Sequence, residues 1–323
     1  MKMNWRKAVA LFAMTPVWFA EPGRWAMAQD VSARFDHRGQ CVGDRNGDGQ
    51  VTIDELVAGV NNILDGCGYT PVEIRFAGHV GDEPFHCGAT YPNVGRNLGE
   101  FTPSDFRFYI SNIRLITPDD REIPVLLEQD GMWQLEDIAL LDFENKTSPC
   151  VNGTVQTNDT VRGRVAPGTY NGIRFVLGVP FRRNHGDASV APAPLSLTAM
   201  FWSWQAGYKF LRVDTALDGY RIHVGSTGCY YAQPGVVGGC ARPNRADIVL
   251  RPFSPQDDVI VADLAALLAD SDLGQNEEGT PPGCMSDPGD DDCDALFRNL
   301  GVDFASGQPV AALQRFFRVM QRQ

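Results

Sequence analysis

The sequence lacks runs of positive charge and the signatures of common enzyme classes. Its 323 residues include 28 Lys+Arg against 40 Asp+Glu, which gives a formal charge of −12. This balance disfavours a nucleic-acid-binding protein, because such proteins carry a clustered basic patch. No G-x-S-x-G, H-E-x-x-H or P-loop motif and no convincing dinucleotide-binding loop occurs. These absences favour a protein that is not an enzyme.

The N-terminus has the pattern of a secretory signal peptide. Basic residues precede a mostly apolar stretch over residues 8–20, and Ala26-Met27-Ala28 fits a cleavage site. The apolar stretch is shorter than the roughly 20 residues that a membrane-spanning helix needs, and no later segment is long enough either. We therefore expect residues 1–28 to be removed. The mature chain, without a transmembrane segment, is expected to be periplasmic or secreted.

The eight cysteines all follow this segment and include no C-x-x-C pair. In an oxidising compartment, an even number of cysteines indicates disulfide bonds more than a thiolate metal site. Cysteines that are close in the sequence form natural short loops, and the two that remain are left to pair with each other. The predicted bridges are Cys41–Cys67, Cys229–Cys240, Cys284–Cys293 and Cys87–Cys150.

Residues 44–55 follow the spacing of an EF-hand calcium loop. Oxygen-bearing side chains occupy the first, third, fifth and twelfth positions, glycine occupies the sixth, and the seventh offers its backbone carbonyl. The predicted ligands are Asp44, Asn46, Asp48, Gln50 and Glu55. A helical pattern follows the loop but no clear helix precedes it, so the module resembles a half EF-hand of the dockerin type. We expect it to bind calcium in a structural role, closed by the Cys41–Cys67 bridge.

From about residue 71 the sequence changes to short apolar segments separated by turn residues. Strands are expected at residues 72–77, 106–116, 123–127, 133–141, 161–165, 172–179, 195–204, 208–214, 220–224 and 247–253, and helices at 260–270, 294–300 and 309–320. Such a pattern indicates a mainly β domain, an antiparallel sandwich or barrel with short C-terminal helices. The predicted organisation is a signal peptide at residues 1–28, a calcium module at 29–70 and a β-rich domain at 71–323.

Residues 200–210 combine bulky aromatic side chains with a methionine. In an extended strand Met200, Trp202 and Trp204 share one face, which on composition alone indicates a core strand. His185 follows a polar turn, and His223 points away from its apolar neighbours in a predicted strand. Imidazoles beside a thioether are a donor set suited to copper, because soft sulfur favours Cu(I).

Several separated motifs occur in an order that resembles the MbnP family. They are Gly178-Val179-Pro180-Phe181 with Asn184-His185, the segment at residues 200–210, Leu211-Arg212-Val213-Asp214, His223-Val224-Gly225-Ser226-Thr227-Gly228-Cys229, and Gly283-Cys284-Met285-Ser286 with Cys293. The resemblance extends from about residue 71 to residue 320. It implies a periplasmic copper-binding protein with a diheme partner of the MauG or cytochrome c peroxidase type, which oxidises a tryptophan to kynurenine. It also implies His185 and His223 as copper ligands and Trp202 or Trp204 as the oxidised residue, with Met200 as a weaker candidate.

Two other functions fit parts of the sequence. The first is a calcium-stabilised extracellular interaction or carbohydrate-binding protein without copper, in which the aromatic residues form a core or a binding platform. The second is a hydrolase that uses His185 or His223 with a carboxylate such as Asp214. That hydrolase needs a reactive serine or cysteine beside the histidine, and disulfide bonds account for all the cysteines.

Overall fold

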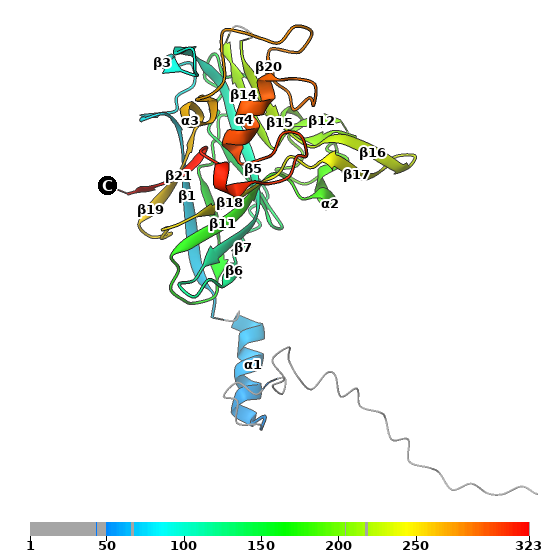
Figure 1. Cartoon of the computed structure of the whole chain (residues 1–323). Coiled ribbons are helices and arrows are strands. Elements are labelled where there is room, and N and C mark those ends of the chain that lie inside the picture. The colour runs from blue at the N-terminus through cyan, green and yellow to red at the C-terminus, as the bar shows by residue number, and fades with distance from the viewer. Residues whose placement is uncertain (1–42, 44–49, 66–67, 204, 217–218, 323) are drawn as a thin grey trace, which may run out of the picture. The chain divides into compact units, whose positions relative to one another are not determined.

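The computed structural model describes residues 43, 50–65, 68–203, 205–216 and 219–322, which belong to two units, Met1–Gly66 and Cys67–Gln323 (Figure 1). In the first unit, α1 spans Ile53–Asp65, where a helix is expected after the calcium loop. The backbone N–H of Thr52 donates to Glu55 Oε2 at 2.9 Å, and the N–H of Glu55 donates to Thr52 Oγ1 at 3.4 Å. This reciprocal pair is a capping box, which satisfies N–H groups at the start of the helix.

The second unit is built from two large sheets. One has the strand order β21 (Phe317–Gln321), β19 (Asp258–Asp263), β1 (Thr70–Val80), β10 (Thr160–Val165) and β7 (Leu126–Leu127), with β2 (Glu83–Pro84) paired to β1. The other has the order β18 (Ala246–Leu250), β11 (Gly172–Leu177), β5 (Pro103–Ile116), β14 (Leu211–Thr215), β15 (Arg221–Val224) and β20 (Gly283–Cys284). Its further strands are β6 (Glu122–Pro124) and β9 (Ile138–Asp142), which pair with β5, and β8 (Gln134–Leu135), which pairs with β9.

Three two-stranded ribbons complete the strands of this unit in the described residues. They are β3 (Tyr91–Val94) with β4 (Gly99–Phe101), β12 (Phe201–Ser203) with β13 (Gly207–Tyr208), and β16 (Thr227–Gln233) with β17 (Val236–Arg242). The helices are short: α2 at Phe181–Asn184, α3 at Leu264–Leu268 and α4 at Asp292–Leu300, with 3-10 turns η2 at Thr198–Met200 and η4 at Ala311–Leu313. In the part of the chain that the structure describes, no helix is both long and apolar enough to cross a membrane.

Phenylalanine rings from both large sheets form the centre of the core. Phe76 of β1 lies 6.1 Å from Phe108 of β5 and 5.8 Å from Phe175 of β11, measured between ring centroids. Phe317 of β21 lies 5.1 Å from Phe175. The inner faces of the two sheets therefore pack against each other, as in a β-sandwich. The mainly β architecture expected from the sequence is confirmed.

Some predictions of strand direction and of helix or strand type were wrong. Most strand pairs are antiparallel, but β1 pairs with β19 and β15 pairs with β20 in parallel. Residues 195–204 do not form one strand, because η2 precedes the three residues of β12. Residues 260–270 and 309–320 are not single helices: strands β19 and β21 take up part of each and pair with each other. Sheet pairing supplies hydrogen bonds and burial that local helical spacing cannot reveal.

Three predicted disulfide bonds are confirmed. Cys87–Cys150, Cys229–Cys240 and Cys284–Cys293 are each joined. The fourth predicted bridge, Cys41–Cys67, lies outside the described residues. Short sequence spacing therefore predicted two of these bridges correctly. The Cys87–Cys150 bridge, which spans 63 residues, was predicted by elimination.

Candidate metal centre

Segments that are distant in the sequence line one cavity of about 510 Å³. Trp202 of β12 forms part of its wall, Cys229 of β16 contributes another part, and Met285, directly after β20, a third. The fold thus brings an indole, a thioether and a disulfide sulfur to one concave surface. Such a surface is where a ligand or metal ion is expected first.

Trp202 packs directly over Gly225. A Cβ atom on Gly225 would lie 2.5 Å from Cζ3 of Trp202 and 2.7 Å from the carbonyl oxygen of Tyr208. Only glycine admits this close approach. The Trp202 ring lies 6.4 Å from the His223 ring between centroids and is tilted by 55°. Its side chain is partly exposed, so the indole borders both His223 and the cavity.

A carboxylate orients His223. The His223 Nε2 atom lies 2.6 Å from Asp214 Oδ1, and the two side chains are 9% and 11% exposed. When Nε2 donates its proton to the carboxylate, Nδ1 keeps the lone pair that a metal ion accepts. Within the described residues, the His223 ring hydrogen-bonds to Asp214 and to no serine hydroxyl, so His223 lacks there the serine contact that the hydrolase alternative needs.

Electrostatics favour a neutral imidazole at this position. Burial lowers the pKa of His223, although the neighbouring Asp214 opposes the shift. Burial acts to raise the pKa of Asp214, but the hydrogen bond with His223 and the charge of Arg212 together hold it well below its usual range. Arg212 Nε lies 3.0 Å from Asp214 Oδ2 and 3.1 Å from Asp105 Oδ2. A neutral imidazole beside an ionised carboxylate is the form that binds a metal ion.

Two buried cations hold the chain just before Trp202. Lys209 Nζ donates to the carbonyl oxygen of Ala199 at 2.9 Å, and an Arg212 guanidinium nitrogen donates to the same oxygen at 2.6 Å. Burial lowers the pKa of Lys209 to about 8. These contacts tie η2 to β14 and so fix where β12 begins.

Asn184 connects the segment of His185 to the segment of His223. The Asn184 side chain is buried, its Oδ1 accepts from the N–H of Tyr208 at 2.9 Å, and its Nδ2 lies 3.5 Å from Ser226 Oγ. Since Ser226 follows His223 by three residues, the two histidine-bearing motifs meet in space. These motifs are separate stretches in the sequence, and the fold makes them neighbours.

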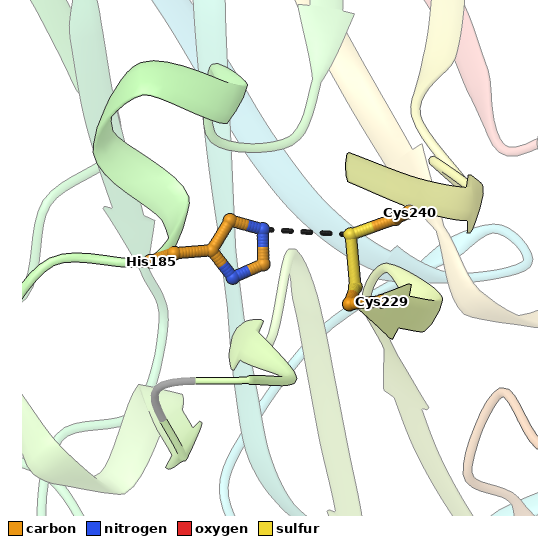
Figure 2. Close-up of side chains that lie close together, drawn as sticks. All are labelled: His185, Cys229 and Cys240. Carbon is orange, nitrogen blue, oxygen red and sulfur yellow. Dashed lines mark hydrogen bonds between the residues drawn. A yellow bond between two sulfur atoms is a disulfide. The ribbon is translucent and has the colours of Figure 1, made fainter. Parts of the chain in front are cut away.

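His185 has different neighbours from His223. Its ring follows α2 and lies 5.0 Å from that of Phe181, and its Nε2 lies 3.5 Å from Cys240 Sγ (Figure 2). His223 contacts Asp214 and Trp202 instead. The convergence of both imidazoles on one metal ion stays a prediction.

The structure separates the other sulfur and tryptophan candidates. Met200 is fully buried in a cluster with Tyr109, Tyr208 and Phe210, so it is a core residue and does not share a strand face with Trp202. Trp204 lies outside the described residues. Met285 was not predicted as a site residue, although it lines the cavity with Trp202. The sequence feature that could have indicated Met285 is its position directly after Cys284.

The calcium module is described in part. Asp44, Asn46 and Asp48 lie outside the described residues, whereas Gln50 and Glu55 lie inside them. The Glu55 carboxylate also accepts from the Thr52 hydroxyl at 3.1 Å, in addition to the capping contact of the Thr52 N–H. Calcium binding by the five predicted ligands stays a prediction.

Comparison with known proteins gives a consistent result. The model of the MbnP family matches residues 69–286. The solved structure of MbnP from Methylosinus trichosporium is similar with a TM-score of 0.69 and 29% sequence identity, over 79% of this chain and 99% of that chain. No curated protein matches the sequence. The matched region contains His185, His223 and Trp202 and ends before residue 293, and it includes none of the predicted calcium ligands.

Proposed function

Because this chain belongs to the MbnP family, and so to the copper-related proteins of the methanobactin system, we propose that it is an exported copper-binding protein whose site is completed by oxidation of a tryptophan. It acts as a metal-binding protein and not as a catalyst. The contact of Trp202 with His223 beside the cavity is the observation that carries the proposal.

The candidate residues fit a copper ion by their donor chemistry. His185 and His223 offer imidazole nitrogens, and Met285 offers a thioether at the same cavity as Trp202. Imidazole and thioether together suit copper, the thioether favouring Cu(I). Asp214 holds His223 in the tautomer that leaves Nδ1 available. A carboxylate is a usual outer partner of a metal-bound histidine.

Trp202 is the tryptophan that we propose to be oxidised. An intact indole is a poor ligand, because its nitrogen carries a proton and only donates. Opening the five-membered ring adds two oxygen atoms and then loses one carbon with its oxygen, which leaves an arylamine and a ketone as donor groups. A diheme protein of the MauG or cytochrome c peroxidase type supplies the oxidising equivalents. The partial exposure of Trp202 at the cavity supports this choice.

Co-production with the diheme partner tests the proposal. Protein made with the partner should bind one copper ion tightly, and peptide mapping should locate the mass change at Trp202. Protein made without the partner, and Trp202→Phe made with it, should bind copper weakly. Trp133→Phe is the matched control, because Trp133 packs against the second core cluster and does not line the cavity. Equal copper affinity in all four samples would contradict the proposal.

The calcium module is proposed to bind one calcium ion in a structural role. A loop of this size has almost no core, so a bound ion and a disulfide bond are the usual means of stabilising it. The Glu55 carboxylate lies at the N-terminus of α1, where it completes the capping box.

A second candidate function rests on the apolar face of α1. Ile53, Leu56, Val57 and Val60 are each more than half exposed. An exposed apolar stripe is a feature of interaction surfaces, so the alternative is a calcium-stabilised interaction protein without copper. The copper experiment distinguishes the two, since the alternative requires no copper binding in any sample.

A further inference from the structure

Three potential metal-binding atoms meet at the edge of the cavity. One side-chain nitrogen of His185 and the Sγ atoms of Cys229 and Cys240 all lie within 4.8 Å of one another. Figure 2 shows the imidazole facing the disulfide, with Nε2 3.5 Å from Cys240 Sγ. Disulfide sulfur is not a thiolate, so these atoms do not form a metal site while the bond is intact.

The spacing of nitrogen and sulfur already suits a shared metal ion. Metal–sulfur bonds of about 2.3 Å and metal–nitrogen bonds of about 2.0 Å at tetrahedral angles place the two atoms about 3.5 Å apart. The observed separation of His185 Nε2 and Cys240 Sγ is 3.5 Å. The imidazole is thus already placed, and the covalent bond between the two sulfurs leaves no thiolate for a metal ion. Among these three atoms, the disulfide bond is therefore what prevents coordination.

The hairpin would keep both cysteines in place after reduction. Cys229 and Cys240 are directly opposite partners in the β16–β17 ladder, and Thr227↔Arg242 and Tyr230↔Gly239 pair on either side. Backbone pairing does not depend on the S–S bond, so the thiols would stay face to face. Side-chain rotation alone can then widen the sulfur separation.

This disulfide is also more accessible than the disulfide of the C-terminal segment. Cys229 is 9% exposed and lines the cavity, and Cys240 is partly exposed on a ribbon whose other residues are largely exposed. Cys284 and Cys293 are both fully buried in the main core. A small reductant therefore reaches the hairpin bridge while the core bridge is protected.

We propose that His185, Cys229 and Cys240 form a second soft-metal site that opens when a dithiol reduces the hairpin disulfide. The dithiol gives two electrons and two protons: the Cys229–Cys240 bond breaks, two S–H bonds form, and the dithiol becomes a disulfide. Cu(I) then displaces both thiol protons to the solvent and takes two sulfur ligands and one imidazole nitrogen. This donor set selects Cu(I) by its softness. It shares His185 with the copper site proposed above but needs no oxidised tryptophan.

The test uses the full mature chain made without the diheme partner, so that Trp202 is intact. The protein is treated with a dithiol, freed of it anaerobically and titrated with Cu(I) against a chromophoric chelator. Reduced protein should bind one more Cu(I) than untreated protein and show thiolate-to-copper charge-transfer absorption. Alkylation and peptide mapping should find Cys229 and Cys240 open.

Variants separate this site from other thiols. Reduced Cys229→Ser/Cys240→Ser should lose the additional Cu(I), and reduced His185→Ala should bind it about 10- to 100-fold more weakly, since even loss of an outer partner costs that much. His86→Ala is the control, because His86 is an exposed histidine that does not belong to the group of His185, Cys229 and Cys240. Equal stoichiometry in wild type and the double serine variant, or equal affinity in wild type and His185→Ala, would overturn the inference. If the second site fails this test but the co-produced protein still binds copper with its disulfide intact, the proposed function stands.

Discussion

Replacing Asp214 by asparagine tests how the fold prepares His223 for a metal ion. The Asp214 carboxylate accepts from His223 Nε2 at 2.6 Å, and both side chains are about nine-tenths buried. Asparagine keeps the size of the side chain and an acceptor oxygen but removes the negative charge. A hydrogen bond to a charged group contributes about 1.5–3 kcal/mol, against about 1 kcal/mol for a neutral one. The variant should therefore lose about 0.5–2 kcal/mol of copper-binding free energy, which is about 2- to 30-fold in affinity.

The assay is competition titration with copper on protein co-produced with the diheme partner. Asp247→Asn serves as the matched control, because Asp247 also pairs with an arginine, Arg174, but lies on β18 and not on the β14–β15 pair that carries His223. Thermal unfolding of both variants would show whether they fold alike. An Asp214→Asn affinity equal to that of wild type, or a loss equal to that of Asp247→Asn, would refute the role assigned to this carboxylate.

Three further outcomes are expected. Glu55→Ala removes the predicted bidentate calcium ligand and should weaken calcium binding sharply in isothermal titration, whereas Asp54→Ala should not. Gly225→Ala should force Trp202 out of its place at a cost of about 1–3 kcal/mol, seen as a lower melting temperature and altered tryptophan fluorescence; unchanged values would contradict the packing argument. Burial raises the pKa of Asp142 to about 7, so the folded protein holds a proton that the unfolded chain releases above about pH 3.9. The free energy of unfolding should therefore fall as pH rises from about 4 to 7, and in urea denaturation Asp142→Asn should flatten that decline.

Local features were predictable from the sequence because their causes are local. The Cys229–Cys240 and Cys284–Cys293 bridges join residues 11 and 9 positions apart, so short loops favour them. The helix at Ile53–Asp65 begins at a capping box that four consecutive residues specify. Alternation of apolar residues likewise located β10 and β11, whose buried positions follow that pattern.

Tertiary structure decided what each functional residue touches. Nothing in the spacing of residues 202 and 225 indicates that an indole lies on that glycine, or that Asp214 orients His223, since β14 and β15 must first pair. Pairing with β1 and β21 likewise makes residues 260–263 part of strand β19, although their spacing predicted a helix over 260–270. Motif order could identify His185 and His223 as candidates, but hydrogen bonds and packing between distant segments determine that one imidazole faces a carboxylate and the other faces a disulfide. Those contacts depend on loop closure over tens of residues, which only the packed sheets stabilise.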